Sequence, residues 1–100
     1  MSRLDVHRMR TGEQGYVLDV QASLLSNLIT RVVVPLVPAE STSKPIRELN
    51  PVFDIDGTLH VMLTQSLASV YVRELGPVKL SLDAQHDMVT RALDILLLGF

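Results

Sequence analysis

The spacing of apolar residues changes once along the chain, near Ser81, and this change restricts the folds open to it. Before Ser81, apolar residues fall in short runs, and the stretch from Tyr16 to Gln21 alternates with period two, which predicts a half-buried strand. After Ser81, the expected N-cap, apolar residues recur at helical spacing until Gly99 ends the helix. Because no connection is long enough for a crossover helix, we expect an antiparallel sheet with one C-terminal helix.

Glycine and proline divide the part before Ser81 into short expected strands. Asp56-Gly57 lies between two β-like runs and predicts a hairpin, since both residues tolerate positive φ. Pro35 has no N–H group, so its strand is expected at a sheet edge or at a bulge. Gly76-Pro77 is expected to end the strand before it, and 11–15 to form a turn with two glycines. The expected strands are 4–7, 16–21, 31–37, 51–55, 58–63 and 70–73.

The composition restricts the function classes. A net charge of -2 gives no basic surplus for binding phosphates, which disfavours direct nucleic-acid binding by the chain alone. The lack of cysteine excludes disulfides, thiolate catalysis and cysteine-based zinc sites, and it fits a reducing cytoplasm. No apolar stretch predicts a membrane span or a signal peptide. A chain of 100 residues is expected to form one domain, 1–100, located in the cytoplasm.

The end of the chain carries more apolar surface than one helix face can bury. Residues 95–98 are all apolar and surround a helical turn, and Phe100 follows Gly99. A sheet covers only one face of a helix, so the remainder is expected to meet a second subunit or another partner, or to stay exposed. Docking of this end on the sheet or on a twin subunit is the simpler structural alternative. The high aliphatic content also favours a dimer.

Motifs for catalysis are absent from the sequence. It contains neither a phosphate-binding glycine loop nor a zinc motif. We expect His60 to be a cross-strand or solvent-facing residue and His86 to be exposed on the first helical turn. Arg8 is expected on a solvated strand face, and Asp87 is expected to pair with Arg91. The residues therefore argue mildly against an enzyme.

Several segments resemble the CcdB toxin family in order, spacing and total length. Each segment is a weak signal alone, but together they extend over nearly the whole chain. They are Asp19-Val20-Gln21 with Leu24-Leu25, Val33-Val34-Pro35-Leu36, Arg47-Glu48-Leu49-Asn50-Pro51-Val52, Met62-Leu63-Thr64, Ala68-Ser69-Val70 with Val72, and Leu98-Gly99-Phe100.

The resemblance implies a mainly β fold with one C-terminal α-helix, an SH3-like barrel of the CcdB/Kid/MazF type with an antiparallel sheet. It implies a homodimer that binds the DNA gyrase A subunit and traps gyrase on cleaved DNA. A CcdA-like antitoxin, largely disordered, would wrap and remove this type II toxin, and the pair would regulate its own operon. The resemblance implies no cofactor, no metal, no membrane partner and no enzymatic activity.

The resemblance also implies a gyrase-binding surface. Two positions depart from the best-known members: Asp94 replaces Asn, and Leu98 replaces a Trp expected to stack on an arginine of gyrase. Such stacking contributes about 0.5–2 kcal/mol, which leucine does not supply. Phe100 and the charge of Asp94 are the features expected to compensate. The implied surface consists of Leu24, Leu25, Asp94, Leu97, Leu98, Gly99 and Phe100.

Two alternatives stay open. The first is a non-toxic CcdB-like module that only binds its antitoxin in operon autoregulation, which the departure at Leu98 favours. The second is a MazF-like ribonuclease toxin. That activity needs an acid–base constellation, usually of Arg, Asp and His, which the sequence alone does not assemble.

Overall fold

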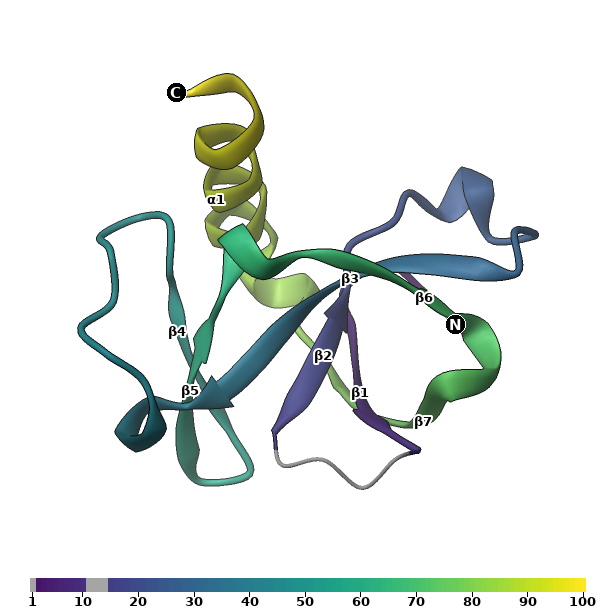
Figure 1. Ribbon diagram of the computed structural model, residues 1–100, viewed down its shortest axis with the longest axis horizontal. Helices are drawn as coiled ribbons and strands as arrows, with labels where there is room; N and C mark the ends of the chain where they lie inside the picture. Colours follow the sequence, from purple (N-terminus) through teal and green to yellow (C-terminus); the bar gives the residue numbers. More distant parts are fainter. Residues whose placement is uncertain (1, 11–14) are drawn as a thin grey trace.

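The computed structural model describes residues 2–10 and 15–100, and these form a curled antiparallel half-barrel with one C-terminal helix (Figure 1). The predicted fold class is therefore confirmed. Of the turn predicted at 11–15, residues 11–14 lie outside the described residues. The elements are β1 (Asp5–Met9), β2 (Tyr16–Asp19), β3 (Thr30–Pro38), β4 (Val52–Ile55), β5 (Thr58–Met62), β6 (Ala68–Tyr71), β7 (Leu75–Ser81) and α1 (His86–Leu98).

β3 is the central strand of the sheet. One of its sides pairs with β2, and the other side is shared by two strands, β6 along its first half and β5 along its second. Pro35 lies between those two partners, and its carbonyl accepts a hydrogen bond from the Leu63 N–H at 2.9 Å. Of the two predicted settings, the sheet edge is therefore wrong, and the register of β3 with β2 continues through Pro35 without a bulge. Since the N and O atoms of one strand residue point to the same side, the missing donor of Pro35 faces the break between the two partner strands.

Both faces of β2 are buried, so the prediction of a half-buried strand is wrong. Tyr16 and Leu18 belong to the main core, which also receives Val89 and Ala92 from α1. Val17 points to the other face and packs in a second apolar cluster. The curl of the sheet covers this second face, which period-two alternation alone does not predict.

The hairpin predicted at Asp56-Gly57 is confirmed. Both residues have positive φ, 56° and 84°, and they join β4 to β5. Asp54, on the outward face of β4, accepts a hydrogen bond from the Gly57 N–H at 2.9 Å. This side chain closes the turn from the preceding strand, as aspartate commonly does.

Gly76-Pro77 does not end a strand, contrary to prediction. β6 ends earlier, at Tyr71, and after one turn of 3-10 helix at Val72–Glu74 the chain enters β7, which contains the pair. β7 pairs with β1 through an irregular register and forms one end of the strand order, where proline is tolerated. A Cβ atom on Gly76 would lie 2.6 Å from the Arg8 carbonyl oxygen, so the close approach of the two strands requires glycine.

α1 begins later than predicted. Ser81 is the last residue of β7, and its hydroxyl accepts a hydrogen bond from the Asp83 N–H at 3.1 Å, ahead of a 3-10 turn at Asp83–Gln85. The predicted end is confirmed, because Gly99 caps the helix with a left-handed φ of 83°. Within the described ranges, no helix is long and apolar enough to cross a membrane.

The expected pair of Asp87 and Arg91 is not formed. Arg91 instead donates to the Glu48 carboxylate at 3.1 Å, and Asp87 lies 3.4 Å from the ring nitrogen Nδ1 of His86. Glu48 has a positive φ of 66° in the loop before β4, and this loop lies within reach of the helix. A contact across the fold has replaced the local pair.

Candidate functional site

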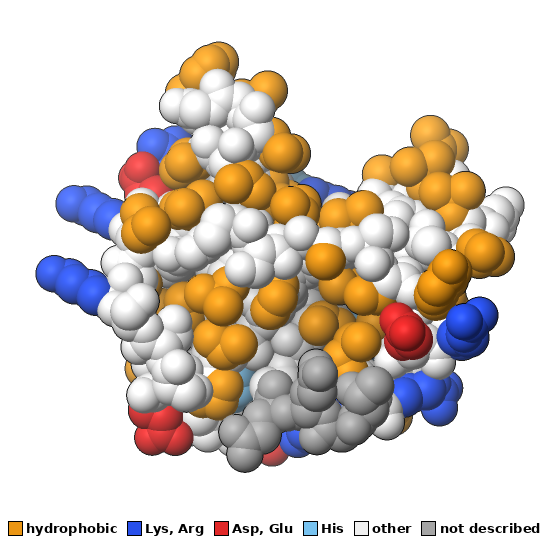
Figure 2. Space-filling view, in the orientation of Figure 1, with side chains coloured by type: hydrophobic (Ala, Val, Ile, Leu, Met, Phe, Trp, Pro, Cys, Tyr) orange, Lys and Arg blue, Asp and Glu red, His pale blue; other side chains and the backbone are white. Residues whose placement is uncertain are grey.

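Two apolar projections rise from the same side of the molecule (Figures 1 and 2). One is the helix tip, defined here as residues 94–100 at the end of α1. The other is the 22–29 loop, which connects β2 to β3. Figure 2 shows apolar side chains at the top of both projections and along the surface between them.

The helix tip extends beyond the core. The buried residues of α1 are Val89 and Ala92, both ahead of the tip, because the sheet supports only that part of the helix. At the tip, Leu97, Leu98 and Phe100 are 66%, 62% and 84% exposed. The alternative in which this end docks on its own sheet is therefore wrong within one subunit, and the predicted surplus of apolar surface is confirmed.

The 22–29 loop is exposed along its whole length. It contains a single 3-10 turn, Ser23–Leu25, which presents Leu24 at 91% and Leu25 at 47% exposure. Leu28 and Ile29 are also exposed, at 50% and 73%. Four large aliphatic side chains in one solvent-facing loop are far more than solubility favours, which is typical of a surface that meets a partner.

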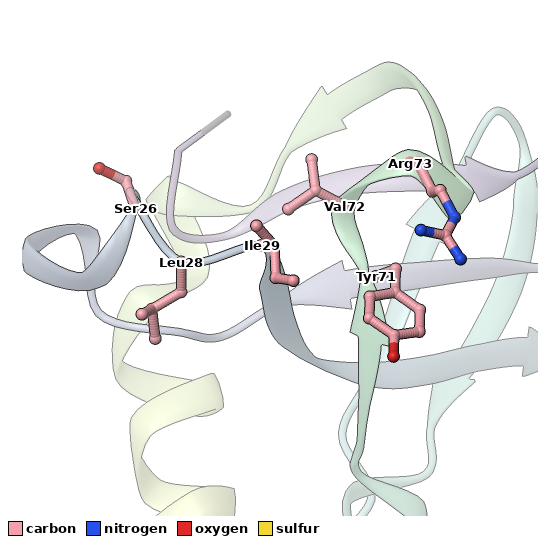
Figure 3. Close-up of a pocket in the computed structure, with 6 residues that line it drawn as sticks. All are labelled: Ser26, Leu28, Ile29, Tyr71, Val72 and Arg73. Atoms are coloured by element: carbon pink, nitrogen blue, oxygen red, sulfur yellow. The ribbon is translucent and has the colours of Figure 1, made fainter.

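Below this loop lies a shallow groove that the sequence did not predict. Its volume is about 460 Å³, and Figure 3 shows the side chains that line it from the loop, from the end of β6 and from the 3-10 turn after β6. The Arg73 guanidinium stacks over the Tyr71 ring at 4.5 Å and is the only charged group among the lining residues. The lining consists of Ser26, Leu28, Ile29, Tyr71, Val72 and Arg73.

A buried polar cluster lies at the base of the same loop. Arg31 on β3 and Asp19 on β2 are both 0% exposed, and Nε and Nη2 of the arginine donate to one carboxylate oxygen at 3.0 and 2.6 Å. The other carboxylate oxygen accepts from the Gln21 backbone N–H at 3.0 Å. Sequence reasoning missed this cluster, because alternation placed Asp19 and Gln21 on a solvent-facing side.

A separate polar cleft of about 370 Å³ lies beside β1, β2 and β5. His60 in this cleft is 5% exposed, so of its two expected placements the solvent-facing one is wrong. The cross-strand placement is confirmed, because His60 pairs with Phe53 on β4 and with Pro38 on β3. Its ring meets the Tyr16 ring edge-on at 5.2 Å, and its Nδ1 lies 2.9 Å from the Thr58 carbonyl oxygen. Arg8 is exposed, as predicted, and donates to the Tyr16 hydroxyl at 3.0 Å. His86 is also exposed, as predicted.

The structure brings together only part of the predicted surface. Asp94, Leu97, Leu98, Gly99 and Phe100 share the helix tip. Leu24 and Leu25 lie on the other projection, well separated from the tip in one subunit (Figure 1). Asp94 is half-buried, and its backbone carbonyl accepts a hydrogen bond from the Gly99 N–H at 3.1 Å.

Among the described residues, histidine and carboxylate side chains do not form a metal centre. Across residues 2–10 and 15–100, no group of three or more such side chains is arranged to hold a metal ion.

Comparisons with known proteins bear on both the family and the fold. The family model described as "CcdB protein" matches residues 3–99. No curated protein sequence matches the chain. The similar solved structures include an endoribonuclease in complex with its cognate antitoxin from Mycobacterial species. It is 18% identical, has a TM-score of 0.77, and is aligned over 100% of this chain and 96% of that one.

Two further solved structures are similar. The Mycobacterium tuberculosis toxin MazF-mt6 is 16% identical with a TM-score of 0.74, over 92% of this chain and 94% of that chain. An endoribonuclease from Mycobacterial species is 17% identical with a TM-score of 0.76, over 100% and 92%. At these identities the likeness shows a shared fold and does not carry over an activity.

Proposed function

The chain belongs to the CcdB family, a family of toxins from toxin–antitoxin systems, and we propose that it binds the DNA gyrase A subunit and traps gyrase on cleaved DNA. Its fold is of the CcdB/MazF type, as the resemblance implied. The observation that carries the proposal is the exposed, apolar helix tip. A partner that binds the tip is needed to explain why it is apolar.

The chemistry of the tip suits a protein partner. Burying a leucine or phenylalanine side chain contributes about 1.5–3 kcal/mol. A partner that covers the three most exposed side chains of the tip would therefore gain a large part of its binding free energy from them. Asp94 adds a half-buried carboxylate next to them, and a carboxylate favours an arginine donor. This supports the proposal that Phe100 and Asp94 compensate for the leucine at position 98.

The proposed active form is a homodimer, and an antitoxin is its proposed second partner. The groove of Figure 3, with Leu28 and Ile29 of the 22–29 loop, supplies an apolar face for a second subunit. A CcdA-like antitoxin with apolar residues would suit the exposed helix tips. In this proposal it competes with gyrase for the tip.

The test is a gyrase cleavage assay with a truncated control. We expect the intact protein to stabilise gyrase–DNA cleavage complexes at micromolar concentration, and a variant that lacks residues 98–100 to lose this effect. Because those residues contribute nothing to the core, the variant is expected to melt within a few degrees of the intact protein. Val52→Ser, which changes an exposed residue on β4, is the matched control and is expected to retain the effect.

Three results would count against the proposal. If the intact protein does not stabilise cleavage complexes but binds its antitoxin tightly and is harmless when overexpressed, the chain is a non-toxic binding module. If the truncated variant unfolds, the tip is structural. If Val52→Ser loses the effect together with the truncated variant, the assay is reporting a general loss of fold.

The polar cleft favours a second candidate function, ribonuclease activity. It gathers Arg8, Tyr16 and His60, side chains that the sequence did not predict to meet. With Nδ1 directed at the Thr58 carbonyl, the other ring nitrogen of His60 would be free to act as a base. We expect no RNA cleavage by the purified protein. Cleavage that is lost in His60→Ala and kept in His86→Ala would establish this second function instead.

A further inference from the structure

We propose that the buried cluster of Asp19, Gln21 and Arg31 fixes the position of the Leu24–Leu25 turn, which makes these three residues positioning residues for the partner-binding surface. The inference rests on the proposed function in one respect, that Leu24 and Leu25 contact the target. The cluster itself touches no partner. It acts on the surface through the backbone of the 22–29 loop.

Gln21 is the link between the cluster and the loop. Its side chain is 7% exposed and makes two hydrogen bonds in opposite directions. Its Oε1 accepts from the Val32 backbone N–H at 3.0 Å, and its Nε2 donates to the Leu25 carbonyl at 3.0 Å. The backbone N–H of Gln21 donates to Asp19. The Gln21 side chain thus connects the Leu25 carbonyl to β3 and to the end of β2, the two strands that the loop joins.

The loop has few other attachments to the body of the molecule. Its own backbone hydrogen bonds run from the N–H groups of Leu25, Ser26 and Leu28 to the carbonyls of Ala22, Ser23 and Leu25, and all stay inside the loop. Among the described residues outside the strand ladders, the bond from the Val72 N–H to the Ile29 carbonyl, at 2.8 Å, is the other one that fastens it. An exposed loop with so few contacts lies at the low end of local stability, so the bond from Gln21 has a large effect on it.

The ion pair of Asp19 and Arg31 is better explained by positioning than by stability. Both side chains are fully buried, and Nη1 of the arginine is buried without a hydrogen-bond partner among the described residues. Removing two charges from water is costly, and apolar replacements of such pairs are often as stable. A salt bridge does hold its carboxylate in one orientation. Here that orientation sets the backbone of Gln21, and hence the direction of its side chain.

The experiment measures hydrogen exchange of loop amides together with gyrase A binding. In Gln21→Met we expect the amides of Leu25, Ser26 and Leu28 to exchange about tenfold faster, as loss of a hydrogen bond predicts. Amides of the β4–β5 hairpin are expected to be unchanged. Gln21→Glu keeps an acceptor for the Val32 N–H but loses the donor to the Leu25 carbonyl, so we expect the same increase in loop exchange. This second variant keeps the test valid if Gln21→Met lowers the stability of the whole protein.

The matched control changes another buried amide that holds a different loop. Asn50 is 5% exposed and bonds to the Ile46 N–H, the Met62 carbonyl and the Gln65 side chain. In Asn50→Leu we expect exchange in the 22–29 loop to match the wild type. We also expect both Gln21 variants to bind the gyrase A subunit more weakly than Asn50→Leu does, when each is compared at equal folded fraction.

The outcomes separate the inference from the proposed function. Unchanged loop exchange in both Gln21 variants, or an equal increase in every element, would overturn the positioning role. Faster loop exchange with unchanged gyrase affinity would also overturn it, because the turn would then not serve binding. If the wild type does not bind gyrase A, the proposed function fails, and selective acceleration in the loop still supports positioning of the turn.

Discussion

At the scale of single residues, Gly76 is where the fold tolerates least change. A Cβ atom there would lie 2.6 Å from the Arg8 carbonyl oxygen, and the Gly76 carbonyl lies 2.9 Å from Nδ1 of the buried His7. We expect Gly76→Ala to lower the free energy of unfolding by about 1–3 kcal/mol, since β7 must move away from β1. Urea denaturation measures this, with Ser69→Ala on β6 as the control. A Gly76→Ala protein as stable as the wild type would show that the two strands separate at no cost.

At the scale of elements, the sequence predicted what local chemistry determines and missed what the curl of the sheet determines. The hairpin at Asp56-Gly57 and the helix end at Gly99 depend on positive φ, which a few neighbouring residues encode. The burial of His60 and of both faces of β2, and the interior place of Pro35, depend on strands that are distant in sequence. Gly76-Pro77 resembles a strand end but lies inside β7 for the same reason. The exposed helix tip was predictable because too many apolar residues surround one turn. The cluster beneath the 22–29 loop was not.

At the scale of the whole molecule, the groove of Figure 3 favours a dimer. We expect sedimentation equilibrium of the wild type to give the mass of two chains. We also expect Ile29→Glu to shift the measured mass towards that of one chain. The reason is that the Ile29 side chain is 73% exposed and lines the groove of Figure 3. Leu59→Glu changes a 56% exposed residue on β5, away from the groove, and is expected to remain dimeric. A dimeric Ile29→Glu protein would place the subunit interface elsewhere. A monomeric wild type would contradict the proposed dimer.

The pairing of β1 with β7 has a consequence for synthesis of the chain on the ribosome. Asp5 pairs with Ser81, so β1 receives its second neighbour only after β2 to β6 have been made. Until then the open side of β1 is an unpaired edge, and the helix that contributes Val89 and Ala92 to the core is missing. A fragment that ends before β7 and α1 therefore has an unpaired β1 edge and an uncovered core. Such fragments expose an unpaired strand edge and apolar surface, which makes them prone to aggregation.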